Sequence, residues 1–469
     1  MWRKRLKIFT ENLLTNRVNI FLTVLFGILV GVNINRFLPI FSENIYFLVA
    51  LPFILIFFLL VFVNMKATLI ILLFSRALLD PFMNTTKVAI LGEGFGIGGA
   101  LNLIVIIFTV VSVLKDNRES IKNYPVRWWI IFLILCFLAI IYSPVHEKAL
   151  KLFINLTSYF CMLVLGLHCV KTKIDKKFWI KIIIYSSLLP VLFANLDLLK
   201  GGRFYEDAGN RISGTFTHPN ILAFYLVLIT AIVFLVLKGE AFNLSRGKVN
   251  ILRLYILNLL VLLFATKTRG AWISCWSLIF IFGLLKDKKY LLLAVILPPL
   301  FMVNPLVSER IRDILTNNSY SRGGRLNSLA WRMRLWQSSI SSIKERLFFG
   351  HGLASFELLS ERFFVANMDR SLSRGVPAHN VYLSLLFEVG VIGLLSYIFI
   401  FFTILKKIFL RMKTVLNKTP FEYAIVFSYI LSYLISSFSD NMLYYLAFNW
   451  YSWFFIGIIL KATILGEEK

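Results

Sequence analysis

The residues best suited to chemistry lie in one long polar interval, residues 304–393, of an otherwise apolar chain. Within it, Pro377 precedes His379 and Asn380, and an apolar run starts directly after them. Proline disfavours helix before it, so His379 and Asn380 are predicted to lie in the N-terminal cap region of the next helix. The positive end of a helix disfavours imidazolium. His379 is therefore a candidate general base, with Asn380 in support; the structural alternative is a cap or an interfacial polar residue.

Arginine is the second chemical signal in this interval. Residues 304–378 carry ten arginines and one lysine, Lys344, whereas the other charge clusters are rich in lysine. A guanidinium offers a planar fork that fits phosphate or carboxylate, and an ammonium is only a point charge. The pattern predicts an anionic ligand; the alternative is that long loops carry such charges without a function. These arginines are Arg310, Arg312, Arg322, Arg325, Arg332, Arg334, Arg346, Arg362, Arg370 and Arg374.

Two further basic positions lie at predicted helix ends outside this interval. Arg269 is placed at the end of a pair of apolar helices, where a charge near membrane depth usually has a function and the alternative is a headgroup anchor. Arg211 and His218 precede a helix that begins with Pro219, and a helix N-terminus favours anions. His218 is a second polar candidate there, or only a cap.

Several motifs are absent from the sequence. It has no Asp-x-Asp, no paired carboxylates in the polar interval and no His/Cys cluster, so no metal site is predicted. No Walker motif occurs, and the glycine-rich residues 92–96 are predicted to form a flexible turn and not a nucleotide site. We expect no cofactor. The energy for a reaction would have to come from an activated substrate such as a lipid diphosphate.

Composition indicates a polytopic membrane protein. Of the 469 residues, 58% are hydrophobic and 16% charged, and the mean hydropathy is +0.78. The net charge of +26 falls in short clusters between apolar runs, so membrane topology explains it better than nucleic-acid binding does. The four cysteines show no CxxC spacing, which argues against a disulfide framework.

Apolar runs near the length of a bilayer-spanning helix predict an all-α bundle of about 12–14 spans. The lysine-rich clusters alternate as the positive-inside rule requires when both termini are cytoplasmic. We therefore predict membrane helices in residues 1–303, an extracytoplasmic active-site loop in 304–380 and C-terminal membrane helices in 381–469. Within the loop, residues 329–343 show helical spacing and are predicted to form an amphipathic helix on the outer membrane surface. The predicted spans are 18–32, 45–63, 67–79, 99–114, 127–142, 150–170, 178–196, 219–237, 251–265, 271–285, 290–303, 381–405, 421–438 and 443–460.

A set of short motifs, in this order and around this loop, resembles the O-antigen ligase and polymerase superfamily of bacterial envelope glycosyltransferases. No single motif is specific, and members commonly have fewer spans than the fourteen counted here, which bears on the subtype. The motifs are RISGTFTHPN at 211–220, TRG at 268–270, RMRLW at 332–336, FGHGL at 349–353 and HNVYL at 379–383 followed by EVG at 388–390.

The resemblance implies a GT-C-like helical fold in the bacterial inner membrane, with the active site on the periplasmic side. It implies transfer of a glycan from undecaprenyl diphosphate to an acceptor sugar, with inversion and without metal or nucleotide sugar. By this resemblance His379 is similar to the catalytic histidine, Arg269 and Arg332 to the diphosphate-binding arginines, and Arg211 and Arg334 are weaker matches.

The partners implied are a lipid-linked saccharide donor, a saccharide acceptor and membrane lipids, with no nucleic acid. A ligase would use lipid A-core as acceptor, and a polymerase would use a glycan repeat unit. The sequence slightly favours the ligase. A flippase or transporter of lipid-linked saccharides is the alternative of another class, although no inverted repeat is visible.

Overall fold

The computed structural model describes residues 64–78, 80, 87–90, 93–115, 125–205, 209–302, 308, 328–364, 375–414 and 421–464. The predicted spans 18–32 and 45–63 lie outside the described residues, as do Arg310, Arg312, Arg322, Arg325, Arg370 and Arg374. The chain divides into two compact units, residues 1–75 with 87–94, and residues 76–86 with 95–469. All seven candidate site residues belong to the second unit.

Helix α4 (Met65–Leu78) and strands β1 (Lys87–Ile90) and β2 (Glu93–Gly96) precede the main helical part of the chain. Helix α4 matches the predicted span 67–79, the shortest of the series. The glycine-rich residues 92–96 were predicted as a flexible turn. That prediction is wrong for Glu93–Gly96, which pairs with β1 in a two-stranded sheet.

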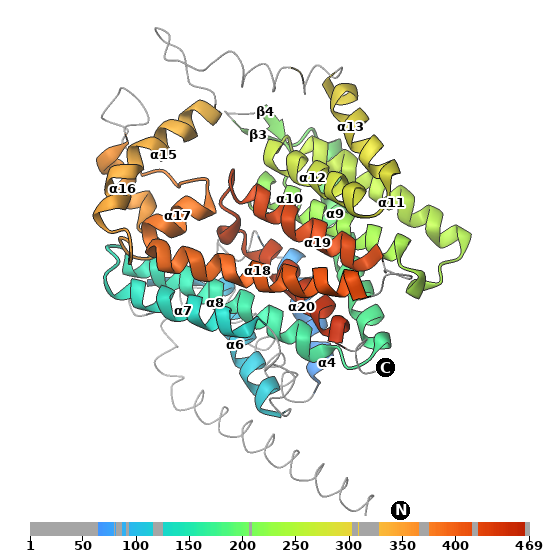
Figure 1. The fold of residues 1–469 in the computed structure, drawn as a ribbon, viewed down its shortest axis with the longest axis horizontal. Coiled ribbons are helices and arrows are strands. Elements are labelled where there is room, and N and C mark those ends of the chain that lie inside the picture. Colours follow the sequence, from blue (N-terminus) through green and yellow to red (C-terminus); the bar gives the residue numbers. More distant parts are fainter. Residues whose placement is uncertain are drawn as a thin grey trace, which may run out of the picture. The chain divides into compact units, whose positions relative to one another are not determined.

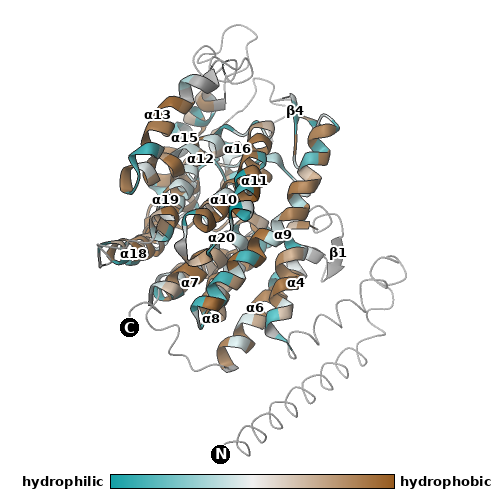
Figure 2. Cartoon of the chain, turned by 90° about the vertical axis from the view of Figure 1, so that its right-hand side faces the viewer, coloured by the Kyte–Doolittle hydropathy of each residue, from teal (hydrophilic) through white to brown (hydrophobic). Residues whose placement is uncertain are grey.

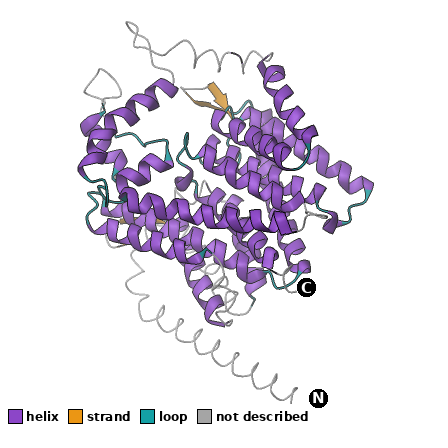
Figure 3. Ribbon diagram, viewed as in Figure 1, coloured by secondary structure: helices purple, strands orange, loops and turns teal. Residues whose placement is uncertain are grey.

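The second unit consists mainly of helices, and each long one coincides with a predicted apolar run (Figures 1 and 3). The all-α class is confirmed for the described residues, with two-stranded ribbons as the exceptions. Strands β3 (Arg203–Tyr205) and β4 (Gly209–Arg211) form one ribbon, in which Arg203 lies opposite Arg211. The helices are α6 (Ile97–Lys115), α7 (Val126–Ile141), α8 (His146–Cys169), α9 (Lys173–Leu199), α10 (Pro219–Lys238), α11 (Arg246–Ala265), α12 (Arg269–Leu285), α13 (Lys288–Met302), α18 (Gly390–Thr414), α19 (Phe421–Ser436) and α20 (Leu446–Ile464).

Five of the described helices are long and apolar enough to cross a membrane: α8, α9, α10, α11 and, over Gly390–Lys413, α18. Most of their turns are hydrophobic in Figure 2, and Leu192 of α9 and Leu254 of α11 are 51% and 67% exposed. Apolar exposure on this scale fits lipid contact. Helix α10 differs because nearly all of it is buried inside the bundle. The total of 12–14 spans and the cytoplasmic termini stay predictions.

Helices α8 and α20, far apart in sequence, pack backbone against backbone. A Cβ atom added at Gly166 would lie 2.4 Å from the carbonyl oxygen of Phe454, and one added at Gly457 would lie 2.3 Å from that of Leu163. Paired glycines of this kind let membrane helices approach closely. The approach holds the middle of α20 against α8, and the short helix η4 (Met442–Tyr444) directly precedes α20.

The predicted extracytoplasmic interval contains α15 (Ser328–Glu345) and α16 (Phe356–Phe363), followed by α17 (Val381–Glu388). Figure 1 shows the three helices grouped together. They enclose a small hydrophobic core of Leu335, Ile343, Phe356, Leu359, Ala378 and Phe387. The predicted helix over 329–343 is confirmed, but its predicted apolar stripe is divided between two faces. Ile343 is buried, whereas Met333 and Ile340 are about half exposed.

The segment 381–405 was predicted as one span, and the structure divides it at Gly390. This residue has φ +75°, and a Cβ there would lie 2.2 Å from the carbonyl oxygen of Phe348. Only glycine accepts this combination readily. Helix α17 therefore joins the core of the loop helices, and the span-length helix begins at Gly390. The hydropathy signal could not show this because both halves are apolar.

Candidate active site

The backbone around His379 is held on both sides. Upstream, Trp336 of α15 donates its indole N–H to the carbonyl oxygen of Ala378 at 2.8 Å. Downstream, the N–H of Val381 donates to the carbonyl oxygen of Ser437 at 2.8 Å. Between them His379 adopts φ +49°, a left-handed conformation that is rare for residues other than glycine. Such a conformation persists where the surroundings impose it, and it is concentrated at functional sites.

Asn380 is the N-cap of α17, as predicted. Its side-chain oxygen accepts a hydrogen bond from the backbone N–H of Leu383 at 3.0 Å. His379 lies one residue before the cap, which leaves its ring outside the helix. The ring meets Trp331 edge-on, at 6.0 Å between centroids, and its Nδ1 lies 3.4 Å from the carboxamide nitrogen of Asn441.

The imidazole of His379 is neutral at ordinary pH. Burial lowers its pKa to about 4, and the positive charge of Arg332 and the nearby His218 act in the same direction, while Asp440 opposes them. This lowered pKa agrees with the neutral ring expected from the sequence. Its main cause here is desolvation, whereas the prediction relied on the helix end. A neutral imidazole can accept a proton from a hydroxyl.

Arg332 of α15 reaches across to the segment that follows α19. Its Nη1 donates to the carbonyl oxygen of Ser439 at 2.6 Å. Burial lowers the pKa of its guanidinium, Asp440 and Tyr445 raise it, and the positive charge of Arg269 lowers it further. Arg332 and Arg269 are thus close enough to repel each other, with the carboxylate of Asp440 beside them. Two arginines brought together in a partly buried place form a favourable environment for an anion.

Arg269 begins α12, directly after a tight turn in which Lys267 has φ +53°. Arg211 supports this turn from β4. Its Nε donates to the carbonyl oxygen of Thr266 at 2.7 Å, and its Nη2 donates to the hydroxyl of Thr268 at 2.9 Å. Arg211 is only 6% exposed. Its guanidinium is therefore used to shape the turn that presents Arg269.

Asn220, the second residue of α10, links Arg211 to Asp440 by hydrogen bonds. Its carboxamide oxygen accepts from Nη2 of Arg211 at 2.8 Å, and its Nδ2 donates to Oδ2 of Asp440 at 3.0 Å. The hydroxyl of Tyr445 donates to the other carboxylate oxygen of Asp440. One continuous hydrogen-bond network therefore runs from the turn before α12 to the segment that receives Arg332.

The remaining candidates are His218, which precedes α10, and Arg334 of α15. His218 caps α10, because its Nδ1 accepts from the N–H of Asn220 at 3.1 Å, and its ring meets that of Tyr205 edge-on. Arg334 lies two residues after Arg332 on α15, about 200° further round the helix axis. Arg332 therefore fits the side that faces Ser439, and Arg334 fits another side.

Sequence reasoning missed Asp440 and Asn441. Both lie in the few residues between the predicted spans 421–438 and 443–460, which read as an ordinary connection. The available signal was the adjacent Asp and Asn at the mouth of two apolar helices. No metal-binding group of three His, Cys, Asp or Glu side chains occurs within the part of the chain that the structure describes.

A family model described as O-antigen ligase matches residues 254–398. The match begins in α11 and ends in α18, so it includes Arg269, Arg332, Arg334, His379 and Asn380. It confirms the resemblance drawn from the short motifs. No curated protein matches the chain.

Proposed function

Since residues 254–398 form a domain of the O-antigen ligase family, we propose that the protein is an O-antigen ligase that transfers a glycan from undecaprenyl diphosphate to lipid A-core. The reaction takes place on the periplasmic face of the inner membrane. One observation carries the proposal: a neutral His379 lies beside Arg332, which in turn lies near Arg269. A proton acceptor next to paired guanidiniums is what glycan transfer from a diphosphate requires.

In the proposed reaction His379 takes the proton of an acceptor hydroxyl. The hydroxyl oxygen forms a bond to the anomeric carbon of the donor glycan, and the bond from that carbon to the diphosphate oxygen breaks. The electron pair leaves with the diphosphate, where Arg269 and Arg332 stabilise the growing negative charge. Attack opposite the leaving group gives inversion at the anomeric carbon. No metal is needed, because the two guanidiniums supply the positive charge.

The other candidate residues support this machinery. We propose that Arg211 holds the turn that presents Arg269, since its hydrogen bonds go to Thr266 and Thr268. Asn380 fixes the start of α17, and His218 fixes the start of α10. Arg334 is assigned to contacts with the lipid-linked donor at the edge of the site.

The test is glycan transfer by the purified protein from a lipid-diphosphate donor, in detergent and with a chelator present. Replacing His379 by Ala should lower the rate by about 100-fold or more, which is the usual contribution of a general base. Arg269→Lys keeps the charge but loses the planar fork, so it should also lower the rate. Lys288→Ala, an exposed change at the start of α13, is the matched control.

Wild-type transfer by His379→Ala would remove the general-base assignment, and a strict need for added metal would contradict the mechanism. The acceptor is tested separately in a deletion strain. Loss of a ligase leaves long lipid-linked chains, whereas loss of a polymerase leaves single repeat units. A transporter would give no glycan-transfer product in the purified assay.

A further inference from the structure

Asn441 lies beside His379, and the proposed mechanism does not use it. Its Nδ2 lies 3.4 Å from Nδ1 of His379. Its backbone is fixed, because its N–H donates to Oδ1 of Asp440 at 2.9 Å and its carbonyl oxygen accepts from the N–H of Tyr444 at 3.0 Å. The side chain thus approaches the imidazole from a firmly held segment.

The contact decides which nitrogen of His379 can act as a base. A neutral imidazole carries one proton, and the other nitrogen accepts. If the carboxamide nitrogen of Asn441 donates to Nδ1, the ring proton sits on Nε2, which then cannot take another. If the carboxamide oxygen faces Nδ1, the ring proton sits on Nδ1 and Nε2 is free. The two orientations of an Asn side chain have nearly the same shape, so the hydrogen-bonding surroundings decide between them.

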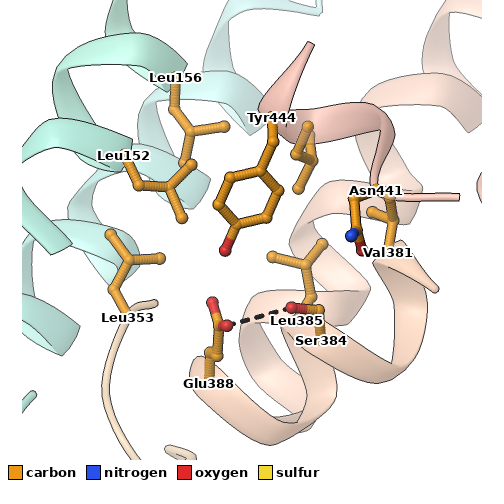
Figure 4. A pocket seen from close by; sticks show the side chains of 10 residues that line it. Leu152, Leu156, Leu353, Val381, Ser384, Leu385, Glu388, Asn441 and Tyr444 are labelled. Carbon is orange, nitrogen blue, oxygen red and sulfur yellow. Dashed lines mark hydrogen bonds between the residues drawn. The ribbon is translucent and has the colours of Figure 1, made fainter. Parts of the chain in front are cut away.

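Those surroundings favour the second orientation. Asn441 also lines a cavity of about 10 Å³, close to the size of one water molecule, together with Glu388 and Tyr444 (Figure 4). The carboxylate of Glu388 accepts hydrogen bonds from the N–H of Ala354 at 2.9 Å and from the hydroxyl of Ser384 at 3.1 Å. The lining of the cavity is otherwise mostly apolar, so Glu388 is the acceptor available to a carboxamide N–H that faces it, and the carboxamide oxygen is left for His379.

We propose that Asn441 is a positioning residue whose carboxamide oxygen accepts a hydrogen bond from Nδ1–H of His379, so that Nε2 receives the proton of the acceptor hydroxyl. The hydrogen bond strengthens when the ring becomes imidazolium, since its donor is then charged. The role rests on the proposed transfer reaction, but the contact itself can be tested without it.

The experiment compares wild-type protein with Asn441→Asp, Asn441→Leu and the control Asn250→Asp, which changes an exposed residue of α11. Diethyl pyrocarbonate modifies neutral imidazole, and mass spectrometry of the peptide with His379 reports its rate between pH 4 and 7. The other charged groups that face His379, Arg332 of α15, Asp440 after α19 and His218 before α10, are the same in all four proteins.

In Asn441→Asp a carboxylate beside Nδ1 should raise the pH midpoint of modification by about one unit or more, and Asn250→Asp should leave it unchanged. In Asn441→Leu, kcat for glycan transfer should fall by at least about tenfold while KM for the donor stays within about twofold. Asn441→Ala, which also removes the carboxamide, replaces the leucine variant if that one does not purify as a single species.

An unmoved midpoint in Asn441→Asp would overturn the contact, and a wild-type kcat in Asn441→Leu would overturn the positioning role. Absence of glycan transfer in the wild-type protein is a different result, because it contradicts the proposed function while the midpoint still decides the contact.

Discussion

At His379 two physical causes act together, because burial and the charge of Arg332 both lower the pKa of the imidazole. A base needs its unprotonated form, so a pKa of about 4 keeps it ready throughout the physiological pH range. It also makes the base weak. In the proposed reaction, stabilisation of the leaving diphosphate by the arginines would therefore matter as much as proton removal by His379.

The pH dependence of transfer follows from these causes. Above about pH 5 the imidazole of His379 is unprotonated and its titration should not change the rate, and below about pH 4 the rate should fall roughly tenfold per pH unit as the imidazole becomes protonated. In Arg332→Gln one of the two causes is removed, so the pKa of His379 should rise and the midpoint of its modification should move to higher pH. An unchanged midpoint would show that the two side chains do not interact.

His379 and Arg269 could be proposed as candidates from the sequence because each lies at the border between a polar segment and an apolar run, whereas Arg332 is singled out only by the family resemblance. Asn380 could be predicted as a cap for the same reason. Asp440 and Asn441 could not, since their importance depends on which segments meet in space. Nor could the structural duty of Arg211, because nothing local in the sequence shows that Thr266 and Thr268 are its acceptors.

At the scale of elements, helical periodicity and apolar length predicted nearly every described helix. They failed where the backbone bends within an apolar segment, as at Gly390, and where an apolar stripe serves two faces, as on α15. In both cases the deciding contacts come from distant residues. The carbonyl oxygen of Phe348 excludes a side chain at Gly390, and the core around Leu335 determines which face of α15 is buried.

The close packing of α8 against α20 has a measurable effect on the site. Gly166→Val would place a side chain where the carbonyl oxygen of Phe454 lies 2.4 Å from a Cβ, so the helices must separate. We expect a loss of roughly 1–3 kcal/mol in stability. Transfer should fall as well, because α20 follows directly on the segment of Asp440 and Asn441.

Thermal unfolding in detergent together with the transfer assay measures both effects. Gly247→Val is the control, because a Cβ at Gly247 would meet no atom within 4 Å. If Gly166→Val unfolds at the wild-type temperature, the two helices are not packed as described.

At the scale of the whole molecule, the candidate site is assembled from four separate stretches of chain. Arg211 and Asn220 come from the region before α11, Arg269 from the start of α12, and Arg332 with His379 from the loop helices and α17. Asp440 and Asn441 come from the connection between α19 and α20. The family match covers residues 254–398 and so leaves out the first and last of these stretches.

This arrangement predicts the behaviour of a divided chain. A break after Asn243, between α10 and α11, separates Arg211 and Asn220 from the rest of the site. Fragments 1–243 and 244–469 should each be inactive, and their co-expression should restore measurable transfer because the helices reassemble in the membrane. Activity of fragment 244–469 alone would show that the first half contributes nothing to the site.

The contact of Gly166 with α20 also has a consequence for the order of events during synthesis. Helix α8 leaves the ribosome early, and its partner is the last helix of the described chain. Until α20 has been synthesised, the face of α8 that carries Gly166 lacks its partner helix. Asp440 and Asn441 come shortly before α20 in the chain, so they are synthesised late as well. A nascent chain can therefore insert most of its helices while still lacking activity. The proposed site is completed only after α20 has been synthesised.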